Sequence, residues 1–288
     1  MSAIFERARA KINLTLRVLG RRADGYHLLE SLVVFAGVGD GVTFAPGVPA
    51  AVEMSSPYAS AIAGNNLVDT ALAALAAADP ILTLGRVSVD KQLPIAAGIG
   101  GGSSDAAAVL RAVRRINPAN GVDWDRLAAG LGADVSVCLA DRSSLVWGVG
   151  EHVEPVEGLP RLDAVLVCPQ SAAPFGKTKS VFGRLAVGEA ATANPPEPLP
   201  AFSGAGALID YIRGVGNDLR TPAHAVLPDS AEAEAALNAE ADCLYVSLSG
   251  AGPTSFGLFP DASSAAGAAG RLHERHPHWW IAATTLGD

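Results

Sequence analysis

Cysteine is scarce in this chain of 288 residues, which contains only Cys138, Cys168 and Cys243, far apart from one another. An odd, scattered set indicates neither a disulfide framework nor a metal cluster, so we expect a reducing, cytoplasmic environment. Long apolar runs are also lacking, since no stretch approaches the ~20 residues that a membrane-spanning helix requires. Charged residues interrupt the opening stretch MSAIFERARAKINL, so no secretory signal is expected.

Positive charge is in short supply, with 21 Lys and Arg against 29 Asp and Glu and a formal net charge of −8. This balance argues against nucleic acid or an anionic membrane as the main partner. An anionic small ligand would therefore need a locally positive pocket. Hydrophobic residues make up 49% of the chain, so we expect an ordered protein of one large or two modest domains.

The most informative stretch is PIAAGIGGGSSD, residues 94–105. It follows a strand-like pattern at residues 86–90 and leads into a helical pattern at residues 106–116. Its four glycines permit close approach of a ligand to the backbone, and its two serines are candidate N-caps. A strand, a glycine-rich turn and a helix N-terminus together predict an anion site, usually for phosphate. The alternative is a tight turn without a ligand.

Two well-known phosphate loops do not fit the sequence. The nucleotide P-loop requires G-x-x-x-x-G-K-[ST], but no lysine follows the glycine cluster. The only Gly-Lys-Thr, at residues 176–178, has Ser171 in place of the first glycine. The dinucleotide fingerprint G-x-G-x-x-G begins at Gly98 and Gly100 but ends on Ser103. We therefore expect a phosphate loop of a third kind.

The N-terminal segment predicts a strand over residues 8–18, with Lys11 and Asn13 on the same face. These side chains belong either to a solvated face or to a site. The Asp24–Gly25 pair predicts a turn that returns into a second strand over residues 28–35. Tyr26 and His27, which follow that turn, are either a stacking site or a half-buried aromatic beside a surface histidine.

Further along the chain, Asn65 and Asn66 are expected to cap a helix that begins near Leu67. Asp134 lies in an apolar run and is either an N-cap or a positioned base. The pattern changes near residues 158–160, which predicts domains over residues 1–158 and 159–288. The second half predicts a β-α-β-β-α-β order, typical of a ferredoxin-like α+β domain.

Several motifs resemble those of the GHMP small-molecule kinase superfamily. The stretch AKINLTL is similar to its first motif, PIAAGIGGGSSD to its central phosphate motif, and SLSGAGPTSFGLF to its third. Further stretches, KINL, RADGYH, LGADV and GVGE, resemble the branch that phosphorylates a cytidyl diphosphate derivative of methylerythritol. The motifs occur in register along essentially the whole chain.

The resemblance implies a two-domain α+β GHMP kinase fold. Its N-terminal α/β domain would carry a left-handed βαβ crossover, and its C-terminal domain would be ferredoxin-like. It also implies ATP-dependent phosphorylation of the 2-hydroxyl of the cytidyl substrate, with ATP and Mg²⁺ as cofactors, in the non-mevalonate isoprenoid pathway. No nucleic acid, membrane or obligate protein partner is expected.

The resemblance also implies the site residues. Asp134 matches the catalytic aspartate, which would accept the hydroxyl proton, and Lys11 matches the catalytic lysine, which would offset charge on the transferred group. Asn13, Tyr26, His27 and Phe182 match substrate-binding positions. Cofactor-binding positions fall on Pro94, Ile95, Ala96, Ala97, Gly98, Ile99, Gly100, Gly101, Gly102, Ser103 and Ser104 around the phosphates, and on Asn66 and Leu67 at the adenosine. Ser104 is a candidate metal ligand, but the sequence does not assign the Mg²⁺ site.

Three rival functions follow from the same residues. A mevalonate- or homoserine-type kinase would keep the reaction and change the substrate, which the stacking pair at residues 26–27 disfavours. A non-catalytic nucleotide-binding protein is disfavoured by the presence of both Lys11 and Asp134. A dinucleotide-dependent oxidoreductase is disfavoured by the incomplete fingerprint.

Overall fold

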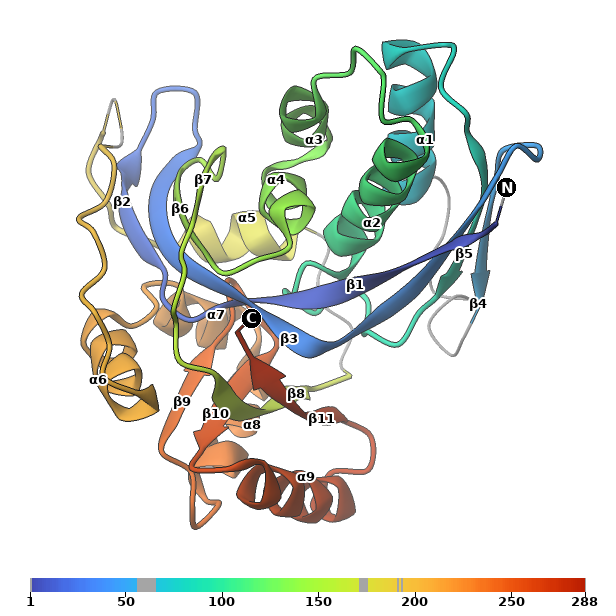
Figure 1. The fold of residues 1–288 in the computed structure, drawn as a ribbon. Coiled ribbons are helices and arrows are strands. Elements are labelled where there is room, and N and C mark those ends of the chain that lie inside the picture. The colour runs from blue at the N-terminus through green and yellow to red at the C-terminus, as the bar shows by residue number, and fades with distance from the viewer. Residues whose placement is uncertain (1, 56–65, 171–175, 191, 193, 288) are drawn as a thin grey trace. The chain divides into compact units, whose positions relative to one another are not determined.

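The computed structural model describes residues 2–55, 66–170, 176–190, 192 and 194–287 (Figure 1). Its chain forms two compact units that interleave in sequence. Unit 1 comprises residues 1–11, 38–95 and 100–141, and unit 2 comprises residues 12–37, 96–99 and 142–288. The glycine-rich stretch therefore contributes residues to both units. The domain division at residue 158 stays a prediction.

Unit 1 contains a sheet in which β5 (Gly85–Asp90) lies between β4 (Ala51–Ser55) and the distal half of β3 (His27–Pro46). The β4–β5 pair is parallel and the β5–β3 pair is antiparallel. Strand β1 (Ile4–Asn13) also pairs with β3. Because β4 and β5 are parallel and α1 (Leu67–Ala78) lies between them in sequence, this is the predicted βαβ crossover. Its left hand stays a prediction.

Helix α2 (Gly101–Ile116) is the centre of the helical layer of unit 1. It packs against α1 and α4 (Ala133–Ala140), and α3 (Trp124–Leu131) packs on α4. The three alanines at positions 106–108 are fully buried, and their small side chains allow neighbouring elements to approach α2 closely. The helix begins at Gly101 after the left-handed Gly100, so the predicted serine N-caps were wrong.

Unit 2 contains two antiparallel sheets, which are continuous with each other through β3 and β11. In the first, β2 (Arg17–Arg21) and β6 (Ser144–Gly148) flank the proximal half of β3, and β7 (His152–Pro155) pairs with β6. The second has the order β11-β8-β10-β9, formed by β8 (Leu162–Cys168), β9 (Tyr245–Leu248), β10 (Ser255–Phe259) and β11 (Trp280–Leu286). The two sheets meet where Leu286 pairs with Ala36.

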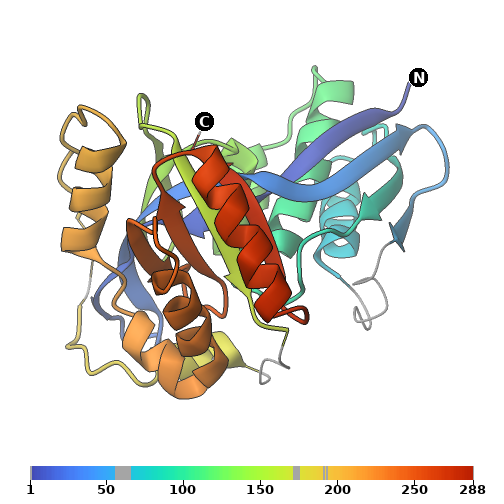
Figure 2. The ribbon, with the colours of Figure 1, turned by 90° about the horizontal axis from the view of Figure 1, so that it is seen from below.

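The second sheet has the β-α-β-β-α-β order predicted for the C-terminal half. Helices α8 (Pro228–Asn238) and α9 (Ala262–Arg275) pack on its strands (Figure 2). Val165 and Val167 of β8 contribute to a core with Leu237 of α8 and Leu272 of α9. The remaining helices lie between β8 and α8 in sequence: α5 (Lys177–Phe182), α6 (Ala205–Val215) and α7 (Arg220–Val226).

The first three strands differ from the sequence prediction. The single strand expected over residues 8–18 is two strands, β1 and β2, and the second strand continues beyond residue 35 to Pro46. Gly39 lies in the part of β3 that was not predicted. A Cβ at this position would lie 2.4 Å from the carbonyl oxygen of Ala8, so a glycine is needed there. This glycine permits close approach of β1 to β3 instead of forming a turn.

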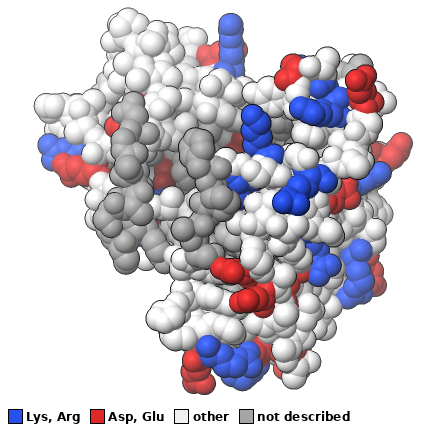
Figure 3. All heavy atoms as spheres, turned by 180° about the vertical axis from the view of Figure 1, so that it is seen from behind, with Lys and Arg blue, Asp and Glu red and all other residues white. Residues whose placement is uncertain are grey.

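Acidic and basic side chains lie interspersed on the face of the molecule shown in Figure 3. Among the described residues, no helix is long and apolar enough to cross a membrane.

Candidate active site

Lys11 and Asp134, which are far apart in sequence, meet within unit 1. Lys11 extends from β1, and its Nζ lies 2.6 Å from Oδ1 of Asp134, the second residue of α4. The lysine side chain is 7% exposed and the aspartate side chain is 51% exposed. The N-cap of α4 is Gly132, so Asp134 does not cap the helix. Its carboxylate is held by a buried cation and remains accessible to a ligand.

The N-terminus of α2 lies beside this ion pair. A Cβ placed on Gly100 would lie 3.1 Å from Cβ of Lys11 and 3.8 Å from Sγ of Cys138. No side chain among the described residues caps α2, so the N–H groups of its first turn remain available for a ligand. Together with the helix dipole and the Lys11 ammonium, these N–H groups make a site suited to an anion.

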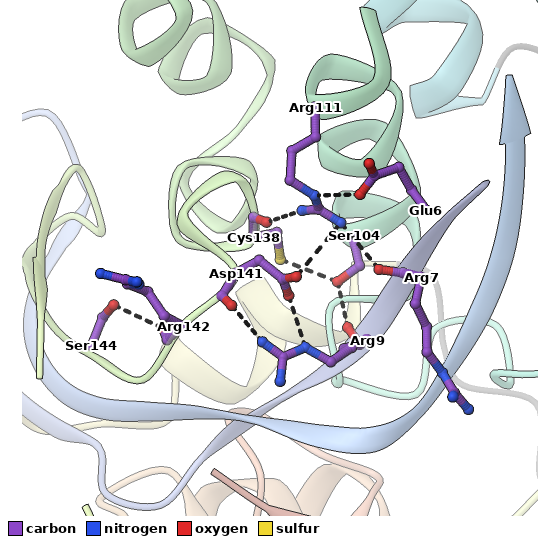
Figure 4. Close-up of polar contacts among 9 residues, drawn as sticks. All are labelled: Glu6, Arg7, Arg9, Ser104, Arg111, Cys138, Asp141, Arg142 and Ser144. Carbon is purple, nitrogen blue, oxygen red and sulfur yellow. Dashed lines mark hydrogen bonds and ion pairs between the residues drawn. The ribbon is translucent and has the colours of Figure 1, made fainter. Parts of the chain in front are cut away.

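A polar network joins β1, α2 and α4 (Figure 4). Arg9 of β1 donates from Nε to Oδ1 of Asp141, the C-cap of α4, at 3.0 Å. Arg111 of α2 contacts Glu6 of β1 at 3.1 Å and donates to the carbonyl of Cys138 at 2.6 Å. These contacts fix the elements that carry Lys11 and Asp134.

Ser104 faces the inside of this network. Its Oγ lies 2.7 Å from the carbonyl oxygen of Arg9 and 3.2 Å from Sγ of Cys138, and its side chain is buried. Burial raises the pKa of Cys138 to about 12, with a further contribution from Asp134, so this thiol is not a nucleophile near neutral pH. The position of Ser104 favours a structural role for its hydroxyl over a role as a metal ligand.

A second buried ionic cluster lies beneath the start of α2. Lys91 contacts Asp40 and, at 2.7 Å, Asp105, and all three residues are buried. Asp40 also accepts from the backbone N–H of Leu93 at 2.7 Å. Burial raises the pKa of Asp105 to about 7; Lys91 opposes this shift and Asp40 adds to it. A Cβ on Gly101 would lie 3.6 Å from Nζ of Lys91, so the cluster supports the helix N-terminus directly.

Within unit 2, residues 96–98 are hydrogen-bonded to, and packed against, the turn between β9 and β10. The backbone N–H of Thr254 donates to the carbonyl of Ala97 at 3.1 Å, and its Oγ1 donates to the same oxygen at 2.7 Å. Gly98 has φ +78°, and a Cβ there would lie 2.3 Å from the carbonyl oxygen of Gly252. Only glycine meets both demands, so this part of the glycine-rich stretch is closely packed against the turn.

Aromatic rings gather at another place in unit 2. The rings of His27 and Phe182 have centroids 4.9 Å apart and an interplanar angle of 32°. Tyr26 is 65% exposed at the end of the turn between β2 and β3. Burial, assisted by the nearby Arg21, lowers the pKa of His27, so its ring is neutral at pH 7. The neutral ring is able to stack on a planar ligand and to accept a hydrogen bond.

Asn13 is buried in unit 2 and has one free hydrogen-bonding atom. Its Nδ2 donates to Oγ of Ser31 at 2.7 Å, and its backbone N–H donates to Oγ of Ser249 at 3.2 Å. Its Oδ1 has no partner among the described residues. A buried acceptor without a donor is costly, so a ligand hydroxyl or amine would be a favourable partner for it.

Asn66 caps α1, as predicted, by accepting from the backbone N–H groups of Val68 and Asp69 at 2.9 and 3.0 Å. Leu67 is the first residue of that helix. Asn65 lies outside the described residues. The adenosine-binding roles assigned to Asn66 and Leu67 stay predictions.

Comparison with known proteins identifies the family. Two family models match the chain: the GHMP kinases N terminal domain over residues 66–144 and the GHMP kinases C terminal model over residues 215–278. A protein named 4-diphosphocytidyl-2-C-methyl-D-erythritol kinase from Methylobacterium radiotolerans is 43% identical over 294 residues, covering 99% of this chain and 100% of that protein. This chain belongs to the GHMP kinase family. A protein of the same name from Paracoccus denitrificans is 45% identical over 285 residues, covering 98% and 96%.

Solved structures agree with the assignment to the GHMP kinases. The crystal structure of 4-(cytidine 5'-diphospho)-2C-methyl-D-erythritol kinase matches with a TM-score of 0.78 and 32% identity, over 99% of this chain and 100% of that chain. The mevalonate kinase of L. major matches with a TM-score of 0.67 at 14% identity, over 100% and 96%, which shows a shared fold alone. The predicted two-domain GHMP kinase fold is thereby confirmed.

The structure of this GHMP kinase brings together some of the residues predicted from its sequence. It joins Lys11 to Asp134 and His27 to Phe182. The sequence reasoning did not single out Thr254 and Lys177, which contact residues 96–97 and Gly252. The Gly-Lys-Thr at residues 176–178 was the available signal for Lys177, but it was tested only as part of a P-loop.

Proposed function

We propose that this chain transfers the γ-phosphoryl group of ATP to the 2-hydroxyl of 4-diphosphocytidyl-2-C-methyl-D-erythritol. The observation that carries the proposal is the Lys11–Asp134 pair beside the uncapped N-terminus of α2. The pair occurs in a GHMP kinase. Relatives named 4-diphosphocytidyl-2-C-methyl-D-erythritol kinase match this chain over nearly their full length. Phosphoryl transfer depends mainly on positioning and electrostatic stabilisation, and the pair and the helix N-terminus together provide both.

Each residue near the reacting groups has a role in this proposal. Asp134 accepts the proton of the 2-hydroxyl as that oxygen attacks the γ-phosphorus, which requires an accessible carboxylate. Lys11 orients Asp134 and offsets the charge that develops on the transferred group. The N–H groups at Gly101 and Gly102 bind phosphate oxygens. Their position at the start of α2 makes that interaction favourable.

Mg²⁺ neutralises charge on the phosphates when it is bound. Among the described residues, no group of three His, Cys, Asp or Glu side chains could hold a metal ion. In kinases, Mg²⁺ generally retains several waters and is held largely by the phosphates of the nucleotide. We leave its protein ligand unassigned.

The cytosine end of the substrate fits the aromatic residues of unit 2. A pyrimidine stacks on Tyr26 and on the His27–Phe182 pair, and the free Oδ1 of Asn13 accepts a hydrogen bond from the substrate. We place the reaction in the cytoplasm, where the three free cysteine thiols would stay reduced.

The test supplies the purified protein with ATP and Mg²⁺ together with the cytidyl substrate, mevalonate or homoserine, each in a separate assay. We expect ADP release only with the cytidyl compound, and a phosphomonoester on its tertiary carbon by ³¹P NMR. Turnover of mevalonate or homoserine alone would replace the substrate assignment. ADP binding without turnover of any of the three would favour a non-catalytic nucleotide-binding protein.

A further inference from the structure

Lys177 belongs to a motif that the proposed function does not use. It is the middle residue of Gly176-Lys177-Thr178 and the first residue of α5. Lysines at helix starts usually extend into solvent, but this residue is only 9% exposed. Lys179, two positions further along the same helix, is exposed. The burial of Lys177 therefore requires an explanation.

The ammonium of Lys177 joins two loops within unit 2. Its Nζ donates to the carbonyl oxygen of Ala96 at 3.0 Å and also to that of Gly252. Ala96 has φ +56°, a left-handed conformation that is unusual for a residue with a Cβ. The lysine thus holds a strained part of the glycine-rich stretch against the turn between β9 and β10. Thr254 makes the neighbouring contact to Ala97.

The charge of Lys177 has no anionic partner in this unit. Among the described residues, no carboxylate lies within ion-pair distance, and the titratable side chain acting on it is Cys168 of β8. Burial raises the pKa of Cys168 to about 11, so this thiol is neutral at pH 8. A buried charge without a counter-charge is unfavourable. Burial accordingly lowers the pKa of Lys177 to about 8.

Two carbonyl oxygens use only two of the three N–H donors of a lysine ammonium. The stretch that Lys177 holds is also the one proposed to wrap the nucleotide phosphates. A bound phosphate chain would supply the negative charge that the surroundings of Lys177 lack. We propose that Lys177 is a positioning residue that fixes the backbone at Ala96 and Gly252, and that nucleotide phosphates balance its charge. This inference rests on the proposed function, because it requires the loop to bind ATP.

An anion bound nearby favours the charged form of Lys177 and so raises its pKa above the value of about 8 in the free protein. Above pH 8 the free protein has lost this proton while the complex retains it. Nucleotide binding must therefore take up a proton at pH 8.5, and affinity must fall as the pH rises through 8. At pH 7 both forms are charged, so neither effect is expected.

The experiment is calorimetric titration of the full chain with Mg-ADP at pH 7.0 and pH 8.5, in buffers of different ionisation enthalpy. For the wild type, we expect uptake of a substantial fraction of one proton at pH 8.5 and almost none at pH 7.0. Lys177→Met should weaken ADP binding roughly 10-fold at pH 7.0, the effect of a lost charge-assisted contact. It should also abolish the uptake. Lys177→Arg should keep more of the affinity without proton uptake, since its charge does not titrate.

Lys179→Met is the matched control, because it removes the same charge from an exposed position on the same helix. It should leave ADP affinity and proton uptake unchanged. Wild-type binding without proton uptake at pH 8.5, or equal uptake by Lys177→Met, would overturn this inference alone. Absence of ADP binding by the wild type would overturn both the inference and the proposed function. If Lys177→Met does not fold, the wild-type proton count still decides.

Discussion

Replacement of Asp134 by asparagine tests the central chemical assignment. The substitution keeps the size of the side chain and an oxygen that is able to accept from Nζ of Lys11, now 2.6 Å from Oδ1. It removes the proton acceptor and the negative charge. General base catalysis contributes typically about 10²–10⁴-fold. We therefore expect kcat to fall by that factor.

Stability and nucleotide affinity should change far less. Lys11 is buried, but the Asp134 side chain is 51% exposed, so water is able to take over part of its role. We expect a loss of about 1 kcal/mol in the free energy of unfolding, well below the ~3–5 kcal/mol for breaking a fully buried pair. ADP affinity should remain within about threefold, because the substitution introduces no negative charge near the phosphates.

The assay combines ADP release with the cytidyl substrate, calorimetric ADP binding and thermal unfolding. Asp125→Asn is the control, because it removes the same charge from an exposed position in the first turn of α3. It should leave kcat and ADP affinity unchanged, with a loss of stability below about 1 kcal/mol. A kcat near the wild-type value in Asp134→Asn would refute the reasoning. An equal loss of kcat and ADP affinity would show that Asp134 acts in binding instead.

Gly102→Ala should stabilise α2 by about 0.5–1 kcal/mol. It should nevertheless raise the KM for ATP, because the new Cβ enters space that no described residue fills and that the phosphates are proposed to occupy. Gly130→Ala in α3, where a Cβ also meets no described residue, should stabilise the protein without changing that KM. Tyr26→Ala should raise the KM for the cytidyl substrate about 10-fold with little effect on the KM for ATP. Phe5→Ala, whose side chain is equally exposed at 65%, should change neither KM. Equal effects of the two substitutions would contradict the stacking role. Asp105→Asn should change the melting temperature more favourably at pH 8 than at pH 5. The pKa of this carboxyl is about 7 in the folded protein and near 3.9 in the unfolded chain, so its ionisation makes the wild type less stable as the pH rises between those values; an equal change at both pH values would contradict this.

Local patterns predicted many of the elements because their causes are local. Asn66 caps α1 through contacts within four residues, β8 is a short apolar run, and α9 buries Ala265, Ala268 and Leu272 at helical spacing. The predicted second strand ended at residue 35, whereas β3 continues through Gly39 and Asp40 to Pro46. Gly39 gives room to the backbone of Ala8, and Asp40 pairs with Lys91, and both causes lie in distant parts of the chain.

The candidate site also has features that local sequence predicts and features that depend on distant parts of the chain. The glycine-rich stretch was visible in the sequence because its composition and its place before a helix carry a physical meaning. The choice between N-cap and base for Asp134 depended on where α4 begins and on whether Lys11 would reach the carboxylate, and the second is a property of the fold. Lys177 could not be placed because Ala96 and Gly252, its acceptors, lie on two segments remote from α5.

The proposed roles of Lys11 and Lys177 differ from that of a P-loop lysine. A P-loop carries its phosphate-binding lysine within the loop, whereas Lys11 and Lys177 come from segments remote in sequence from the glycine cluster. Lys11 lies beside Gly100 at the start of α2, and Lys177 fixes the backbone at Ala96. Because each lysine is held by its own contacts, the charges are positioned during folding and need little reorganisation when a ligand binds. Loss of Lys11 should therefore lower kcat, whereas loss of Lys177 should weaken nucleotide binding and leave the Lys11–Asp134 pair intact. Equal effects on both parameters from both substitutions would show that the two lysines act as one group.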